Sequence, residues 1–453
     1  MTIPMIKGWP RLGVVPNFCF KQLEFLTQAR KRHGDVFQIQ FGSTEIVVLG
    51  HPRHAQHVFV EHAANYRNKG AGGFRIAPLP LMKEGLATTI QPQSAYRQQR
   101  RGVVPHFQPQ RLSALADRVV EAIDLRLEAW ERNPRALNAL DLDVETTRIA
   151  IGAIGLSVFG VRVDSEESDR LAQEVRIVMD YLWKGTIQNT LPDWVPFPFG
   201  VRYKRAIEWV NSFVSELIDR SLSATAEPDN LISRLAGQVA EGEMSQNQLH
   251  NEAVTLLMAG YESTASNLAW TFHLLRQHPA VLRELEDEIL GVLGRRKPTY
   301  ADVKQLALSR RVLQESLRLF APSYWTQRQA EHDDEIDGSR IKAGTIVAPM
   351  VYLIHHHPET WAVPFEFDPD RFLPEQVASR HAMAWLPFGA GQRKCIAIEF
   401  ALMKGQLVLA RILQRFCVRG LSKLPPKMDV GSNVRPRAGG LFEVKQRTEP
   451  DGG

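Results

Sequence analysis

The chain has 453 residues, of which 44% are hydrophobic and 23% are charged, a composition that is ordinary for a globular protein with a large core. Its 55 Lys and Arg residues exceed its 50 Asp and Glu residues only slightly, and they are spread along the chain, which argues against a nucleic-acid-binding protein. Three cysteines far apart in the sequence exclude a disulfide framework and favour a reducing compartment.

No Gly- or Ser-rich linker, low-complexity tract or internal repeat divides the chain, so we expect one large domain over residues 1–453. The N-terminal residues contain neither the apolar region of a signal peptide nor the roughly 20 apolar residues of a membrane-spanning helix. We therefore expect a cytoplasmic protein without a transmembrane anchor.

The N-terminal part of the sequence predicts a helix followed by two strands. Helical periodicity runs from Phe18 to Arg32, and His33-Gly34 ends it. Strict alternation predicts a strand over Val36–Phe41, and a short apolar run predicts a second strand over Ile46–Leu49. Together with residues 336–352, the stretch of about 34–60 should form a minor β-sheet.

Helical patterns dominate from about residue 110 to residue 295, interrupted at 190–200 by three prolines that predict a loop. The clearest helix runs from Gln246 to Gln277 and would be roughly 45 Å long. Ser245 and Gln248 form a capping-box pattern at its start, and Pro279 follows its end. Its centre is apolar nearly all round, which predicts burial.

The C-terminal part predicts a helix ending near Leu319, short strands around Arg340–Ile346 and Ile346–Met350, and a helix over about Ala397–Phe416. Between them lies an irregular stretch of prolines and aromatic residues, preceded by three consecutive histidines at 355–357. Their position in a loop favours a structural role over a metal site. The fold class is therefore mainly α with a minor β-sheet.

A glycine-containing loop over Leu386–Ala397 carries Cys395. Two glycines, a basic residue two positions before the cysteine and an apolar residue after it suit a tight turn that presents one thiolate to a metal. Cys19 and Cys417 have no comparable surroundings. Taken alone, Cys395 could equally be a structural thiol or a ligand of another metal.

Two segments upstream of this loop each contain an arginine that bears on its function. Glu315 and Arg318 are three residues apart on a predicted helix, so both side chains lie on one face and can form an ion pair. Such a pair is usually found on a surface when it stands alone. The second segment, Phe367–Phe372, contains Arg371.

The centre of the long helix contains the run Ala259-Gly260-Tyr261-Glu262-Ser263-Thr264. Ionisable and hydroxyl groups on an otherwise apolar helix are costly to bury unless they are paired, which favours a functional role. The alternative is that the Ser263 hydroxyl merely bonds back to a helix carbonyl.

Together these four segments resemble the cytochrome P450 family of haem-thiolate monooxygenases. The cysteine loop fits the family pattern F-G-x-G-x-R-x-C-x-G at every defined position except the last, where Ala397 replaces glycine. The resemblance implies the family's fold, in which a long central helix lies over haem b and the cysteine loop lies beneath it. It also implies that Cys395 is the metal ligand and that Phe388 and Gly389 belong to the haem-binding loop. The residues that would lock the cysteine side of the haem are Glu315, Arg318 and Arg371.

The run in the long helix resembles the family's A-G-x-[DE]-T oxygen-activation motif. The resemblance implies that Ala259 lies at the haem, that Gly260 leaves space for O₂, and that Glu262 relays protons through the hydroxyl of Ser263 or Thr264. Ser263 stands where the family usually has threonine, and a serine lacks the methyl group that restricts χ1.

Further residues are assigned by position within the family pattern. Candidate partners of the haem carboxylates are Arg393, Arg328, Tyr96 and Arg100; for the last three, a plain surface or core role is the alternative. Candidate substrate contacts are Ser323, Trp325 and Met258. The segments Leu81–Thr89 and Leu191–Phe199 would cover the pocket, whose apolar lining suits a largely hydrophobic molecule.

The implied activity is oxidation, for instance hydroxylation, of a hydrophobic small molecule such as a terpenoid, a fatty acyl chain or a polyketide. No flavin or iron–sulfur motif is present, so electrons should come from a ferredoxin or flavodoxin with an NAD(P)H-dependent reductase. A basic footprint for that partner is expected at Lys394, Lys404, Arg97 and Arg101, and we expect a monomer. The alternatives are a peroxide-using, coupling or rearranging haem-thiolate enzyme, a haem sensor, and a haem-free helical binding protein.

Overall fold

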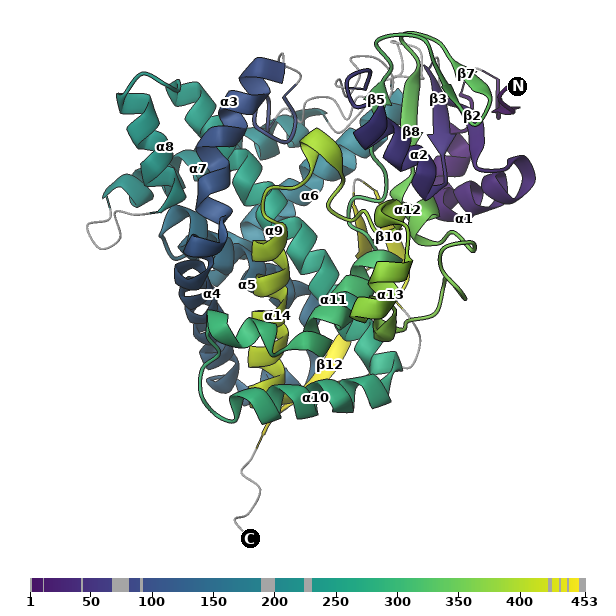
Figure 1. Cartoon of the computed structure of the whole chain (residues 1–453). Coiled ribbons are helices and arrows are strands. Elements are labelled where there is room, and N and C mark those ends of the chain that lie inside the picture. Colours follow the sequence, from purple (N-terminus) through teal and green to yellow (C-terminus); the bar gives the residue numbers. More distant parts are fainter. Residues whose placement is uncertain are drawn as a thin grey trace.

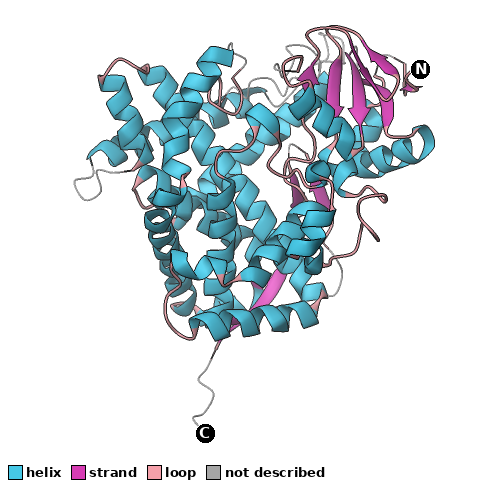
Figure 2. Ribbon diagram, in the orientation of Figure 1, coloured by secondary structure: helices cyan, strands magenta, loops and turns pink. Residues whose placement is uncertain are grey.

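The computed structural model of the chain describes residues 2–10, 12–41, 44–66, 81–89, 93–188, 200–223, 230–422, 426–431, 433–437 and 440–447, without the side chains of 19–20 and 182–188. Helices fill most of this structure, and most strands gather at the end that holds the N-terminus (Figures 1 and 2). The longer helices are α1 Val15–His33, α3 Gln93–Val103, α4 Pro109–Glu131, α5 Leu142–Ile154, α6 Ser165–Gln188, α7 Gly200–Ser223, α8 Leu231–Ala240, α9 Gln246–Gln277, α10 Pro279–Leu293, α11 Ala307–Leu319 and α14 Ile398–Arg415. Shorter helices are α2 Pro52–Gln56, α12 Val351–His355 and α13 Pro374–Ser379.

The largest sheet has the strand order β1-β2-β3-β8-β5, formed by Met5–Ile6, Val36–Phe41, Thr44–Leu49, Ile346–Pro349 and Arg328–Gln329. Strands β2 and β3 are antiparallel, whereas β3 and β8 run parallel with Ile46 opposite Ile346. This pairing joins the N-terminal strands to a segment 300 residues later. The smaller sheets are β4-β12-β9 (Leu140–Asp141, Leu441–Gln446, Phe416–Gly420), β6-β7 (Asp334–Ile336, Ser339–Ile341) and β10-β11 (Met428–Val430, Val434–Pro436).

Several predicted boundaries are confirmed. Helix α9 has the predicted limits, and the Ser245 hydroxyl caps it by accepting a hydrogen bond from Gln248 N at 3.1 Å. The reciprocal half of the capping box is absent, because the Gln248 amide donates to Glu252 Oε1 instead. The predicted β-rich stretch of 34–60 is too long, since residues 52–61 form α2 and the π-helical turn η1 (His57–Glu61). The predicted loop at 190–200 lies outside the described residues except for Gly200, where α7 begins.

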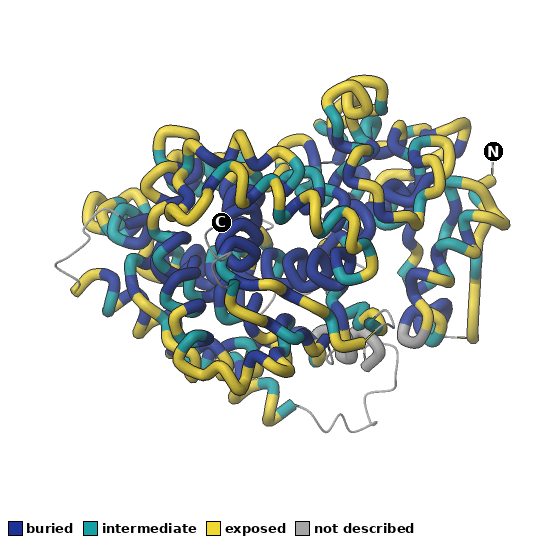
Figure 3. Tube along the Cα trace, turned by 90° about the horizontal axis from the view of Figure 1, so that it is seen from below, coloured by how far each residue is buried: buried dark blue, intermediate teal, exposed yellow. Residues whose placement is uncertain are grey.

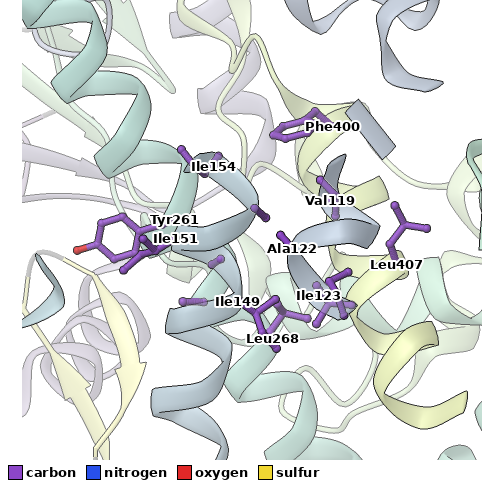
Figure 4. Close-up of a cluster of buried hydrophobic side chains, with 14 of the residues drawn as sticks. Val119, Ala122, Ile123, Ile149, Ile151, Ile154, Tyr261, Leu268, Phe400 and Leu407 are labelled. Atoms are coloured by element: carbon purple, nitrogen blue, oxygen red, sulfur yellow. The ribbon is translucent and has the colours of Figure 1, made fainter. Parts of the chain in front are cut away.

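The main core lies where α4, α5, α9 and α14 meet, and Figure 4 shows their apolar side chains converging. Exposed residues are confined to the periphery of the helical body, with the buried segments inside (Figure 3). Gly260 allows the close approach of α5 and α9, because a Cβ at this position would lie 2.5 Å from Ile154 Cδ1. The glycine therefore has a packing role at this contact. None of the described helices is long and apolar enough to cross a membrane.

One loop residue is strained. Val363 has a φ of 44°, a conformation that a β-branched residue rarely adopts, and it is 58% exposed. Replacing Val363 with asparagine, which tolerates this region, is expected to stabilise the protein by about 1 kcal/mol. Thermal unfolding of V363N checks this. V377N is the control, because Val377 is also exposed but has ordinary helical geometry; equal unfolding temperatures for V363N and the unmodified protein would contradict the expectation.

Candidate active site

An accessible stripe runs along the middle of the otherwise buried helix α9. Ala259 is exposed and Ser263, one turn later, is partly exposed, while Met258, Tyr261 and Thr264 are buried. Residues four apart share one helix face, so Ala259 and Ser263 line a single open surface. This face is where the sequence places the oxygen-side residues.

Both hydroxyl groups of the motif bond to the helix itself. Ser263 Oγ donates to Ala259 O at 2.8 Å, and Thr264 Oγ1 donates to Gly260 O at 3.1 Å. These are the back-bonds of the structural alternative considered for Ser263. They leave the oxygen lone pairs of both hydroxyls free to accept a further hydrogen bond.

Glu262 points to a different space from Ser263. It lines a pocket of about 500 Å³ between α5, α6, α9 and β11, and its Oε1 lies 3.7 Å from Arg435 Nη1. Burial raises the pKa of Glu262, while Arg435 and Asn433 oppose that rise. The structure therefore separates the carboxyl group of the motif from the accessible stripe, although the two residues are adjacent in sequence.

The cysteine loop is closed by its own backbone. Cys395 N donates to Phe388 O at 2.9 Å, and Gly389 and Gly391 both have φ of 64°. Gly391 also packs against η1, because a Cβ there would lie 2.2 Å from Phe59 O. These contacts explain why the turn requires glycine at both positions.

The Cys395 residue is exposed, although the protein atoms around its thiol partly desolvate it. Desolvation raises the pKa of the thiol, whereas Ala397 N–H, which lies 3.5 Å from Sγ, and the charges of Arg100 and Lys394 lower it. The N–H group and the two cations favour the thiolate, the form of cysteine that binds a metal.

Glu315 and Arg318 form a fully buried ion pair. Arg318 Nε and Nη2 each donate to one Glu315 oxygen at 2.7 Å, and both side chains are 0% exposed. The remaining Arg318 donors bond to the carbonyls of His355, Pro364 and Glu366. Arg371 Nε lies 3.4 Å from Glu315 Oε1. The three predicted locking residues are thus brought together.

His355 connects this ion pair to the cysteine loop, a link that sequence reasoning missed. Leu386 N donates to His355 Nε2 at 2.7 Å, so the ring hydrogen is on Nδ1, which donates to Arg318 O at 3.1 Å. Burial holds the pKa of His355 well below its usual value, which keeps the ring neutral. The run of three histidines predicted only a structural role for this segment and did not indicate a contact with Arg318 or Leu386.

Four residues predicted to meet the haem carboxylates form one basic cluster. Arg393 lies over the Tyr96 ring at 3.6 Å, and Arg100 donates to Tyr96 Oη at 3.2 Å. Arg328 is buried, and its burial and the charge of Arg393 lower its pKa to about 10. A small pocket lies between Arg328 and Arg393.

Among the described residues, no carboxylate forms an ion pair with Arg100, Arg328 or Arg393. Arg328 is buried, and Arg100 and Arg393 are partly exposed. A buried cation without a counter-charge is costly, so this cluster suits an anionic group from outside the chain. The two propionates of a haem would supply that negative charge. The cluster therefore fits haem b.

Lys404 is not on the surface, which corrects its predicted place in a basic docking footprint. It is 1% exposed and donates from Nζ to Gly260 O at 2.7 Å, joining α14 to the centre of α9, which lie side by side in Figure 1. Desolvation lowers the pKa of Lys404 to about 7. The sequence gave no sign of this burial, because a lysine on an amphipathic helix usually faces solvent.

The low pKa of Lys404 predicts that burying this lysine lowers the stability of the folded protein by an amount that depends on pH. The folded-state pKa of about 7 lies below the ordinary value of 10.5. The loss of stability is therefore largest below pH 7, where the buried lysine is charged, and it disappears as the pH rises to 10.5. K404M should therefore be more stable than the unmodified protein near pH 6.5, by roughly 5 kcal/mol at most, with a smaller difference at pH 9.5. Denaturant unfolding at both pH values measures this, with the exposed Lys445 replaced in K445M as the control. A stability difference independent of pH would contradict it.

The three candidate substrate contacts differ in how far they are buried. Ser323 is exposed, and its hydroxyl donates to Trp325 O at 3.3 Å. Trp325 is packed in the core beside Phe18, and Met258 is buried in the main core. These positions favour core roles for Trp325 and Met258 in this structure.

The segment Leu81–Thr89 is fastened to α9 by a carboxyl group that sequence reasoning did not single out. Leu86 N donates to the buried Glu252 Oε2 at 3.0 Å, and desolvation raises the pKa of Glu252 to about 7. The other proposed cover, Leu191–Phe199, lies outside the described residues.

Comparison with solved structures identifies the fold. The fold matches the crystal structure titled cytochrome P450DA heme domain with a TM-score of 0.86, covering 99% of this chain and 98% of that one at 24% identity. The fold is therefore that of a haem domain.

The sequence identifies the family. Residues 3–442 match the family model for Cytochrome P450. The chain is 30% identical to cyclooctatin synthase of Streptomyces melanosporofaciens, over 95% of this chain and 91% of that protein. It is 30% identical to cyclooctat-9-en-7-ol 5-monooxygenase of the same organism (90% and 88%) and 28% identical to pentalenene oxygenase of Streptomyces avermitilis (90% and 89%). The chain belongs to the cytochrome P450 family and is a P450 monooxygenase with haem b as its cofactor.

Proposed function

We propose that Cys395 binds the haem iron and that the Ala259–Ser263 stripe of α9 faces the opposite side of the haem. The closed glycine turn, the Ala397 N–H near Sγ and the neighbouring cations all suit a thiolate ligand at this position. The observation that carries the assignment is the cluster of Arg100, Arg328 and Arg393 without a carboxylate partner beside the same loop. These arginines would hold the haem carboxylates.

Haem b, when bound, supplies the activation of O₂. The residues of the chain would position substrate and deliver protons. The Ser263 hydroxyl lies on the accessible stripe, where Oγ can accept one proton and release the hydroxyl proton. Its hydrogen bond to Ala259 O fixes the orientation of the hydroxyl group. The raised pKa of Glu262 favours holding a proton at the neighbouring pocket.

The proposed substrate class is a cyclic terpenoid. Three relatives that match nearly the whole chain at 28–30% identity are named for cyclooctatin, cyclooctat-9-en-7-ol and pentalenene, compounds with cyclic terpenoid skeletons. An apolar cover also suits a hydrocarbon, since Leu81, Met82 and Leu86 are buried in the segment fastened to α9.

Ligand titration of the purified holoenzyme tests this class. A panel of cyclic terpenoid alcohols, fatty acids of equal carbon number and macrolactones is added while the spin state of the iron is followed by absorption. We expect the spin-state shift and product formation with O₂ and a reductase system to be confined to the terpenoids. A shift and turnover with the fatty acids alone would reject the terpenoid assignment.

Electrons would come from a separate ferredoxin or flavodoxin that docks near the cysteine loop. Arg97, Arg101 and Lys394 are exposed, and Arg100 donates to Lys394 O at 2.9 Å, which joins α3 to the loop on one face. These three cations replace the predicted footprint that included Lys404. They complement an acidic protein partner.

Reversing these charges is expected to slow reduction. The variant R97E/R101E/K394E should be reduced by an acidic ferredoxin at least about 10-fold more slowly at low salt, with unchanged substrate affinity. Stopped-flow absorption measures the rate. A control variant, R132E/R135E, reverses two exposed arginines that follow α4 and should retain the normal rate. Equal rates for the triple variant and the unmodified enzyme would refute the footprint.

A further inference from the structure

Two histidines, His57 and His62, lie at the two ends of the π-helical turn η1. His62 N donates to His57 O at 2.8 Å, so this hydrogen bond spans five residues. A π-turn places residues i and i+5 above one another, where an α-helix would offset them. The two imidazole rings accordingly stack, with centroids 3.8 Å apart and planes inclined by 19°.

One carboxylate faces both rings. Asp334, at the start of β6, places Oδ2 2.8 Å from His57 Nε2 and Oδ1 3.3 Å from His62 Nδ1. Tyr66 donates to the same Oδ2 at 2.8 Å. Asp334 is therefore the acceptor that the two imidazole rings and the Tyr66 hydroxyl share.

We propose that His57, His62 and Asp334 bind a divalent cation of the zinc type. The two nitrogens and the carboxylate lie within 4.8 Å of one another. Zinc bound at 2.0–2.1 Å by tetrahedral ligands separates those ligands by about 3.4 Å. The 3.3 Å between His62 Nδ1 and Asp334 Oδ1 is near this value, whereas the 2.8 Å between His57 Nε2 and Asp334 Oδ2 is a hydrogen bond that would lengthen when the ion takes the place of its hydrogen. Water from solvent would complete the coordination, because His62 is exposed. Tyr66 would orient the carboxylate from behind.

A second group of possible ligands, His51, His357 and Glu359, is less suited to a metal. His51 Nδ1 accepts a hydrogen bond from Arg53 N at 3.1 Å, so the neutral ring carries its hydrogen on Nε2. It is Nε2 that faces Glu359, at 3.4 Å, and its hydrogen cannot move to the occupied Nδ1, whereas a cation at His57 can displace the Nε2 hydrogen to Nδ1 of that ring. This group provides a matched control.

The proposed ion would act structurally, by fastening the π-turn to the β6–β7 hairpin. The turn also contains Phe59, whose carbonyl contacts Gly391 of the cysteine loop and whose ring lies 5.0 Å from the Arg328 guanidinium. An ion at Asp334 would thus stiffen a segment that supports the loop and the basic cluster. Bound ions that favour the folded state raise the unfolding temperature.

Zinc titration of the untagged holoenzyme, from which divalent cations have been removed with a chelator, tests the proposal, with competition against a chromogenic chelator as the measurement. We expect one equivalent to bind, with at least 10-fold weaker binding in H62A and in D334N, and about 10-fold weaker binding in Y66F. H51A should bind as the unmodified enzyme does. Zinc should also raise the unfolding temperature of the unmodified enzyme and of H51A by a few degrees, but not that of D334N.

Three outcomes would overturn the site. They are no stoichiometric binding, equal affinity in D334N and the unmodified enzyme, and loss of the equivalent in H51A rather than in H62A. The first would mean that His57 and His62 simply donate hydrogen bonds to Asp334. Absorption of the haem in each variant verifies that the holoenzyme is intact, so a variant that fails to fold is recognised, and Y66F then provides the comparison.

Discussion

Replacing Cys395 with serine is expected to abolish the haem-thiolate spectrum and to lower monooxygenase activity at least about 100-fold, more than the loss of a residue that only supports a ligand. A serine hydroxyl is a weak donor to iron, so the ferrous carbonyl form should lose its red-shifted Soret band. The turn itself should survive, because Cys395 N bonds to Phe388 O through the backbone. Absorption of the reduced carbonyl complex measures the change.

Cys417 provides the matched control. It is the other free cysteine in the described part of the chain and lies exposed on strand β9. C417S should retain both the spectrum and the activity. A normal thiolate band in C395S, or its loss in C417S, would show that the iron ligand is not Cys395.

Replacing Arg318 with leucine is expected to destabilise the protein by about 3–5 kcal/mol, because it leaves the Glu315 carboxylate buried without its main partner. The carbonyls of His355, Pro364 and Glu366 also lose their donor. Since His355 links Arg318 to Leu386, we expect weaker haem retention as well. Denaturant unfolding and the haem content after gel filtration measure the two effects.

A surface pair with similar geometry serves as the control. Arg310 donates to both oxygens of Glu399, at 3.0 and 3.1 Å, and both side chains are partly or fully exposed. R310L should cost less than about 1 kcal/mol, because water already solvates both charges. Similar costs for R318L and R310L would contradict the view that burial makes the Glu315–Arg318 pair critical.

Local sequence patterns predicted much of the fold. The limits of α9 could be predicted because Ser245 caps the first turn and His278-Pro279 ends the last. The strand Val36–Phe41 was recognised from its alternation, which the structure repeats as an alternation of partly buried and buried residues. Residues 52–60 were assigned wrongly to the β-rich part, because a short segment carries too few residues to show its period.

The candidate site was predictable where its residues are close in sequence. Glu315 and Arg318 are three positions apart on one helix, so their pairing followed from helical geometry. The separation of Glu262 from Ser263 did not follow, because it depends on which elements pack beside α9. Arg435, the partner of Glu262, comes from a strand more than 170 residues later.

The sequence by itself indicated the haem-thiolate class through the resemblance of its motifs to the cytochrome P450 family, because the glycine turn around Cys395 and the i, i+3 pair at Glu315 are each contained in a few consecutive residues. Only the tertiary structure decided that Lys404 is buried against Gly260, that His355 joins Arg318 to the cysteine loop, and that His57 and His62 meet Asp334. The physical reason is the same in each case. These contacts join segments far apart in the chain, and which face of a helix is buried is decided by the packing of its neighbours.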